Sequence, residues 1–171
     1  KILTVHAHWG EYLPQWHPWE DYRQSYAARE DLGGGVIRTL THPLDYLRYL
    51  IGEVETLWSF NGHISALELD VEDVAEIGLK FSNGAIGGVH LNYFQRPPVH
   101  RLEIVGTHGT LRWDNADGSA IVGLGQGAVV EADGRVRAGQ ADAGDVGQAR
   151  VGVHLRDRPD PAARVLGVGL V

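Results

Sequence analysis

The sequence predicts an α+β fold in which helices pack on one face of an open, mainly antiparallel β-sheet. Two observations lead to this prediction. Apolar residues recur at helical spacing only in the first third of the chain, and from residue 55 onward short strand-like runs follow one another, separated by turn signals. Helices that precede a run of strands, rather than alternating with them, are typical of α+β domains.

The first predicted strand covers residues 2–8, which are rich in β-branched residues and alternate in polarity. The segment 11–30 follows and is dense in aromatic residues. Pro18 lies within it, and two residues later Glu20 and Asp21 suit the first turn of a helix. We therefore expect a helix to start near Pro18.

One helix is predicted over residues 36–51, after a triple glycine and before Gly52, which suits the position that follows a helix. Apolar residues recur there every three or four positions. Pro43 lies inside this pattern and has no N–H to offer the carbonyl of Thr39. The helix is therefore predicted to kink beside His42.

Strand-like runs fill most of the remaining chain, at 56–67, 71–82, 85–95, 100–107 and 110–114. Glycine, proline and asparagine between them mark turns. The acidic cluster Asp70, Glu72 and Asp73 is interpreted as a solvated strand entry. Residues 119–125 and 127–136 predict a last hairpin, with Asp133-Gly134 as its turn.

These elements place one domain at residues 1–139 and leave an irregular tail at 140–171. The tail shows no helix or strand period, yet its hydrophobicity does not fall to the level of a disordered segment. It is rich in Gly, Ala, Val, Asp and Arg, as expected for a GC-rich gene translated in a shifted frame. A non-native sequence is therefore one hypothesis for the tail.

Composition excludes several classes of function. The net charge of −7, with Lys and Arg spread thinly, argues against nucleic acid as a partner. The absence of cysteine excludes disulfides, thiolate chemistry and cysteine zinc sites, and the histidines show no metal-site spacing. No apolar run approaches the roughly 20 residues of a membrane helix, so we expect no membrane association. The lack of cysteine fits a cytoplasmic location. Lys1 opens directly into a strand-like run and the chain has no Met, which favours a fragment of a longer protein.

The segment GGGVIRTLTHPLDYLRYLIGE at 33–53 resembles the first helix of the C-terminal domain in the Gfo/Idh/MocA family of NAD(P)-dependent oxidoreductases. Residues 11–30 are similar to the preceding segment of one branch of that family, and residues 73–113 to its central strands. The likeness covers about residues 1–114. It implies a two-domain enzyme whose Rossmann domain, with the dinucleotide site and a catalytic Lys, lies outside this chain.

The resemblance assigns the family's catalytic histidine to His42, as an acid–base group or a binder of a substrate hydroxyl; a histidine bonded to a local carbonyl is the alternative. The family's Asp one turn earlier is absent, and Arg38 or Thr39 takes its place. Arg38 is a candidate for binding a substrate carboxylate or phosphate, or is simply an exposed helix residue.

Further substrate contacts are expected from an aromatic segment that contains Trp16, His17 and Tyr22, since aromatic faces suit the C–H faces of sugars. The alternative is a loop held to the core by its aromatic side chains. Arg96 ends a predicted strand and is a weaker candidate, because surface arginines beside Pro-Pro are common.

The predicted function is therefore the substrate-binding and dimerising half of an oxidoreductase for a sugar, cyclitol or related polyol. NAD or NADP would bind the missing domain, so the isolated chain is expected to be inactive. A homodimer or larger assembly through the open sheet face is the expected oligomer. The alternative is a non-catalytic module that dimerises or binds through that face.

Overall fold

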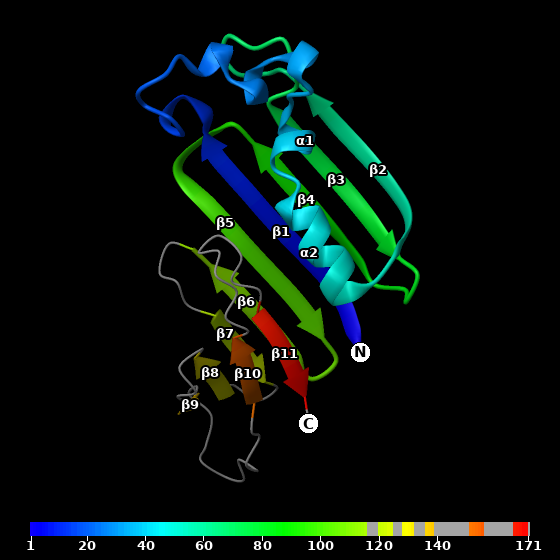
Figure 1. Ribbon diagram of the computed structural model, residues 1–171. Helices are drawn as coiled ribbons and strands as arrows, with labels where there is room; N and C mark the ends of the chain where they lie inside the picture. Colours follow the sequence, from blue (N-terminus) through cyan, green and yellow to red (C-terminus); the bar gives the residue numbers. More distant parts are fainter. Residues whose placement is uncertain (116–119, 125–127, 132–135, 139–150, 156–165, 171) are drawn as a thin grey trace.

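The protein, described here from a computed structural model, forms one large sheet with helices on a single face (Figure 1). The structure describes residues 1–115, 120–124, 128–131, 136–138, 151–155 and 166–170. Among these, nine strands hydrogen-bond in the order β2-β3-β4-β1-β5-β6-β7-β8-β9. All neighbours are antiparallel except β1 and β4, which run parallel. The predicted fold class is confirmed.

The elements follow the chain in a simple order. The strands of the large sheet are β1 (Ile2–Tyr12), β2 (Val54–Gly62), β3 (Val74–Phe81), β4 (Ile86–Asn92), β5 (Phe94–Gly106), β6 (Gly109–Asp114), β7 (Ala120–Leu124), β8 (Ala128–Glu131) and β9 (Val136–Ala138). The helices are the 3-10 turns Leu13–Gln15, Tyr22–Gln24, Tyr26–Ala28 and Glu30–Leu32, then α1 (Val36–Thr39) and α2 (His42–Ile51). None of the helices within the described residues is long and apolar enough to cross a membrane.

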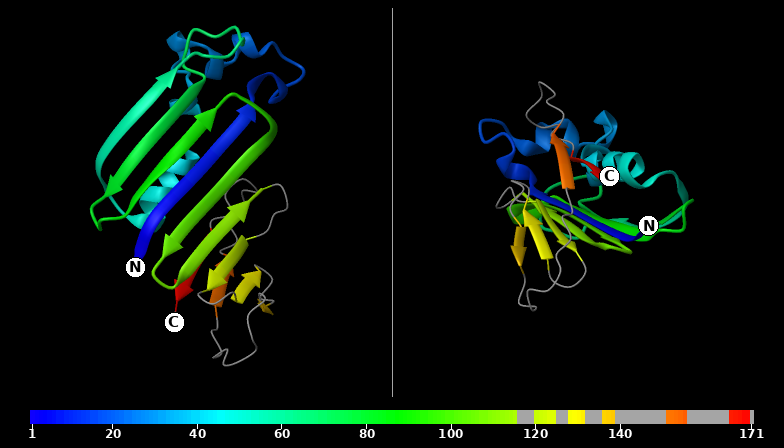
Figure 2. Two further views of the ribbon diagram at one scale, coloured as in Figure 1. Left: turned by 180° about the vertical axis from the view of Figure 1, so that it is seen from behind. Right: turned by 90° about the horizontal axis from the view of Figure 1, so that it is seen from below.

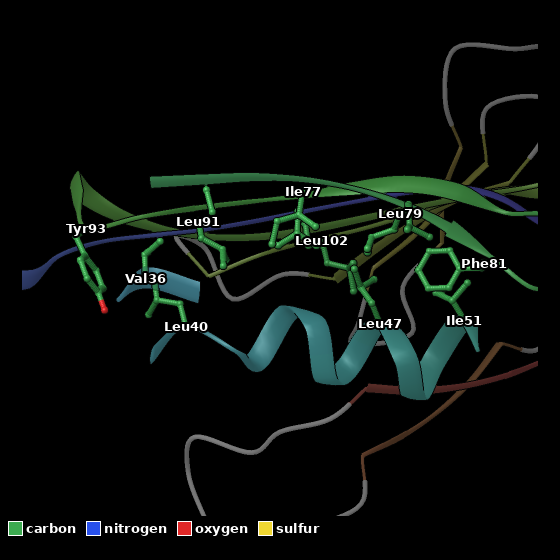
Figure 3. Close-up of a cluster of buried hydrophobic side chains, with 14 of the residues drawn as sticks. Val36, Leu40, Leu47, Ile51, Ile77, Leu79, Phe81, Leu91, Tyr93 and Leu102 are labelled. Carbon is green, nitrogen blue, oxygen red and sulfur yellow. The ribbon is translucent and has the colours of Figure 1, made fainter. Parts of the chain in front are cut away.

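The core lies between the two α-helices and the sheet (Figure 3). Both α-helices lie along the same face, and the described part of the chain places no helix on the opposite face (Figure 2). Alternate residues of each central strand point into the core, as the period of two requires. The buried side chains labelled in Figure 3 are Val36, Leu40, Leu47, Ile51, Ile77, Leu79, Phe81, Leu91, Tyr93 and Leu102.

The prediction of one kinked helix over 36–51 was wrong in detail, because two helices are separated at Leu40 and Thr41. Leu40 leaves the helical conformation at φ −97° and ψ 47°. Pro43 then lies in the first turn of α2, where its missing N–H costs no hydrogen bond. The proline begins a new helix instead of bending an old one.

The helix expected near Pro18 was also wrong. Residues 17–20 form a turn closed by the Glu20 N–H and the His17 carbonyl at 3.0 Å, and short 3-10 turns follow. Prolines at 14 and 18 and the many aromatic residues leave no continuous helical pattern there.

The interpretation of the acidic cluster before β3 as solvated holds for Asp70, which is exposed, but was wrong for Asp73. Asp73 is fully buried, and its two oxygens accept the N–H groups of Ile64 and Ser65 at 3.0 Å each. Glu72 accepts the Ile37 N–H at the start of α1, 3.2 Å away. These carboxylates satisfy backbone donors at the ends of elements, and Asp73 explains why β2 stops at Gly62.

The last predicted hairpin corresponds to β7 and β8, which pair with Leu124 opposite Ala128. The turn expected at Asp133-Gly134 lies outside the described residues. Within 140–171, for which the sequence predicts no regular element, β10 (Val151–Leu155) pairs with β11 (Leu166–Leu170). Both strands carry apolar residues at every second position, a short pattern that the glycines between them obscured.

Gly87 provides a test of the parallel pairing of β1 with β4. A Cβ at this position would lie 2.0 Å from the Val5 carbonyl oxygen, which is backbone and cannot rotate away. We predict that Gly87→Ala lowers the free energy of unfolding by about 1–3 kcal/mol, measured by urea denaturation. Gly62→Ala is the matched control, since a Cβ there meets no atom of the described residues within 4 Å; its change should stay within about 0.5 kcal/mol. Equal effects of the two substitutions would contradict this packing.

Candidate functional site

The candidate site lies on the helix face of the sheet, where α2 begins beside β1. His42 is the first residue of α2 and is exposed. Its ring lies 5.2 Å from the Trp9 ring, centroid to centroid, at a tilt of 38°. Trp9 also stacks on His100 of β5, its directly opposite residue, at 3.8 Å and 22°. One indole therefore contacts two imidazoles that come from different elements.

Glu11 binds two members of this group. Glu11 and Trp9 are two residues apart on β1, so they share a face. The Trp9 indole N–H donates to Glu11 Oε1 at 3.2 Å, and His100 Nε2 lies 2.7 Å from the same oxygen. Burial alone would raise the pKa of Glu11, but the hydrogen bond and charge of His100, with help from Trp9, hold it below its usual value. Glu11 is therefore a carboxylate at neutral pH.

The two residues that replace the family's Asp lie in different environments. Arg38 is exposed on α1 and, within the described residues, forms no ion pair. Thr39 is half-buried, with its hydroxyl directed into the protein close to the Tyr93 phenol. The structure thus leaves Arg38 available to a ligand and does not present the Thr39 hydroxyl to solvent.

The aromatic segment forms a small cavity of about 250 Å³, which brings Trp16, His17 and Tyr22 together. His17 Nδ1 lies 2.6 Å from Glu20 Oε1, and the Tyr22 hydroxyl accepts the Glu68 N–H at 3.1 Å. Trp16 packs edge-on against buried Tyr93 with ring centroids 5.8 Å apart. The segment is held to the core by its aromatic residues and still leaves a hollow between them.

Arg96 lies at the same end of the sheet, near the start of β5. Its guanidinium carbon is 4.1 Å from the centroid of the Tyr12 ring, a cation–π contact. The side chain is exposed, so it remains accessible while Tyr12 fixes its direction.

The opposite, helix-free face holds a larger hollow of about 540 Å³. One row of side chains in register crosses it, one residue from each of β3, β4, β1, β5 and β6: Glu76, His90, His8, Arg101 and Asp114. Glu76 Oε2 lies 2.7 Å from His90 Nδ1, and Arg101 pairs with Asp114. The sequence showed only that the histidines lack metal-site spacing, and it did not connect His8 with His90.

The side-chain amide of Asn92, which is buried, joins the two histidines of this row. Its Nδ2 lies 3.4 Å from His8 Nε2 and 3.1 Å from His90 Nε2, while its Oδ1 accepts the Phe94 N–H. An amide NH₂ only donates, so it can hydrogen-bond to either Nε2 in the tautomer that leaves this nitrogen without a proton. Burial, followed by the nearby charges of His90 and Arg101, lowers the pKa of His8.

Sequence reasoning missed Trp9, Glu11 and His100. The spacing of Trp9 and Glu11 on a predicted strand places them on one face, and the sequence contained that signal. The position of His100 depends on the register between β1 and β5, which the sequence alone does not give. In the described residues, His, Asp and Glu side chains nowhere gather in threes at a spacing that would hold a metal ion.

Comparison with known protein families gives a match over most of the chain. A family model described as "GFO/IDH/MocA C-terminal domain" matches residues 1–112. No curated protein matches the sequence.

Several solved structures share the fold. A levoglucosan dehydrogenase in complex with NADH has a TM-score of 0.63, 21% identity, and covers 72% of this chain. The WlbA dehydrogenase from Bordetella pertussis, in complex with NADH and UDP-GlcNAcA, has a TM-score of 0.58, 22% identity, and covers 67%. An inositol dehydrogenase homolog from Azotobacter vinelandii, complexed with NAD+, has a TM-score of 0.65, 16% identity, and covers 77%. This chain covers 35%, 36% and 36% of the WlbA, levoglucosan and inositol proteins respectively.

The pKa of His8 gives a pH test of the helix-free face. The charged form of His8 is less favourable in the folded protein than in the unfolded chain, because its folded pKa is lowered from 6.5. Its contribution to stability is therefore present above pH 6.5 and is lost as the pH falls through the lower folded pKa. We predict that the difference in unfolding free energy between the native protein and His8→Gln shrinks from pH 7.5 to pH 5, measured by urea denaturation. A difference that stays constant over this range would contradict the assignment.

Proposed function

Because this chain belongs to the Gfo/Idh/MocA family, whose C-terminal domain matches it over residues 1–112, we propose that it is the substrate-side half of an NAD(P)-dependent oxidoreductase. Its substrate is a sugar, a cyclitol or a related polyol. The observation that carries the proposal is the exposed imidazole of His42 at the start of α2, beside an ordered aromatic group. The fold shared with a levoglucosan dehydrogenase and an inositol dehydrogenase homolog supports this substrate class.

His42 is the proton-handling group of this proposal. Oxidation of a secondary alcohol by hydride transfer releases the hydroxyl proton, and a histidine is suited to accept it near neutral pH. An imidazole on the surface of the helix face can meet a substrate held between this domain and a second one. His42 would accept the proton in oxidation and return it in reduction.

The substrate would be held by residues around the same end of the sheet. The hollow between Trp16, His17 and Tyr22 offers ring faces for the C–H side of a sugar and a histidine for its hydroxyl groups. Arg38 and Arg96 are both exposed and would bind a carboxylate or phosphate on the substrate. The Thr39 hydroxyl is buried, so Thr39 would support the position of Tyr93 and would not contact the substrate.

NAD or NADP would bind a Rossmann domain supplied by another part of the protein. The cysteine-free composition favours a cytoplasmic location for the protein. The residues proposed here hold substrate and move a proton, whereas the cofactor takes or gives the hydride. We therefore expect this chain alone to bind NAD weakly and to show no turnover.

The main test is His42→Asn in the full-length protein. We predict a decrease of about 10²–10⁴-fold in kcat/KM, because the amide cannot exchange a proton with the substrate hydroxyl. The assay follows NADH absorbance with levoglucosan and inositol as first substrates.

The control for this test is His108→Asn, which changes a histidine in the turn between β5 and β6. It should leave kcat/KM unchanged. Near-normal activity of His42→Asn would reject the catalytic proposal and favour the alternative, a non-catalytic module. The replacement of the family's carboxylate by Arg38 and Thr39 is the observation that supports that alternative.

Self-association through the helix-free face is the second part of the proposal. Trp58 and Phe60 of β2 lie on this face and are 55% and 77% exposed. On β5 and β6 the charges alternate, with Arg101 opposite Asp114 and Glu103 opposite Arg112. Consider a second copy related by a two-fold axis that lies parallel to the sheet and perpendicular to its strands. In that arrangement each arginine would face a carboxylate of the other copy. Exposed aromatic side chains and a self-complementary charge pattern both favour a homodimer or larger assembly.

Phe60→Asp in the full-length protein tests this surface. We predict at least a tenfold weaker self-association, measured by sedimentation equilibrium, because a carboxylate would be desolvated in the contact. Tyr49→Asp on α2 is the matched control, since Tyr49 is also an aromatic residue that is 77% exposed and lies on the helix face. Equal effects of the two substitutions, or none for Phe60→Asp, would overturn this assembly.

A further inference from the structure

We infer that Glu11 is a positioning residue for His42, acting through the Trp9 indole. The inference rests on the proposed function, since it gives His42 its role. Glu11 touches neither the substrate nor the reacting atoms in this arrangement. It fixes the ring against which the proton-handling imidazole lies.

The Trp9 side chain is anchored on β1 by two contacts. A tryptophan side chain has two rotatable bonds and a single hydrogen-bond donor, its indole N–H. That donor is bound by Glu11 Oε1 at 3.2 Å, and the ring is stacked on His100 at 3.8 Å. The same Glu11 oxygen lies 2.7 Å from His100 Nε2. One carboxylate therefore fixes both rings of the stack at their polar edges.

The His42 imidazole depends on Trp9 for its orientation. In residues 1–115, the His42 side chain takes part in no hydrogen bond or ion pair, and its ring contact is with Trp9. His42 is also the first residue of a helix, where the backbone restrains the side chain less than in the middle. The orientation of the imidazole thus depends on a ring that Glu11 holds.

The burial of the Glu11 and His100 side chains costs free energy. The side chains of Glu11 and His100 are only 23% and 18% exposed, and burying charged or polar groups is unfavourable unless they are paired. The strands β1 and β5 are already joined by a long backbone ladder, so they do not need this side-chain link. The low pKa of Glu11 keeps the carboxylate charged, and hence able to hold both donors, throughout the neutral range.

The test compares Glu11→Ala, Glu11→Gln and Trp9→Phe in the full-length protein, with kcat and KM measured separately. Misplacing a reacting group by about 1 Å costs up to about 10²-fold in rate. We therefore expect Glu11→Ala to lower kcat by about 10–100-fold with little change in KM. Glu11→Gln keeps one acceptor oxygen and should recover part of the rate, and Trp9→Phe, which keeps a ring without the donor, should fall between them.

A second readout separates positioning from general loss of stability. The ring protons of His42 lie near the Trp9 ring and so experience its ring current, which NMR of histidine-labelled protein detects; the His42 signals are assigned from their absence in His42→Asn. Glu11→Ala should move these signals toward ordinary histidine values. Asn83→Ala is the structural control, because Asn83 donates to the Ile51 carbonyl at the far end of α2. It should lower stability and leave both the signals and kcat in place.

The outcomes separate this inference from the proposed function. If His42→Asn is inactive but Glu11→Ala keeps its kcat and its His42 signals, Glu11 has no positioning role and the proposed function stands. If His42→Asn is fully active, the proposed function itself fails. If Asn83→Ala changes kcat and the His42 signals as much as Glu11→Ala does, the effect is structural and the inference is overturned.

Discussion

The alternation of side chains along β1 is the constraint on which the rest of the structure depends. This strand lies in the interior of the sheet, paired with β4 on one side and β5 on the other, so its register is fixed twice. Val5, Ala7, Trp9 and Glu11 face the helices, and His6 and His8 face the other way. A shift of one residue would bury the histidines and expose the site.

This alternation gives the two faces of the sheet different chemistry. On the helix face, the apolar residues of β1 form the core, and the strand then continues beyond the core into Trp9 and Glu11 beside His42. On the helix-free face, every position in register with His8 carries a titratable or charged side chain, from Glu76 to Asp114. In the proposed function, this separation leaves the helix face for the substrate and the helix-free face for self-association.

The sequence was sufficient for the fold class and for most strands, because the alternation in a run such as 74–81 is local and the turns between strands use Gly, Asn and Pro. The sequence was not sufficient where residues distant along the chain determine where an element ends or which side chains meet. The end of β2 at Gly62 depends on the buried carboxylate of Asp73. The break at Leu40 was missed for a local reason, since Pro43 fits both a kink and a helix start. The stack of Trp9 with His100 and the pairing of His8 with His90 depend on register, which no local pattern reports. His42 was identified through the family motif, and its contact with Trp9 follows only from the fold.

The most direct test of the account is a crystal structure of the full-length protein with NAD(H) and a bound sugar or polyol. The account predicts the reacting hydroxyl within about 2.6–3.2 Å of the His42 imidazole, on the face that carries α2. It also predicts that Trp9 and Glu11 keep their hydrogen bond in that complex. A substrate bound on the helix-free face, or a reacting hydroxyl out of reach of His42, would contradict the central claim.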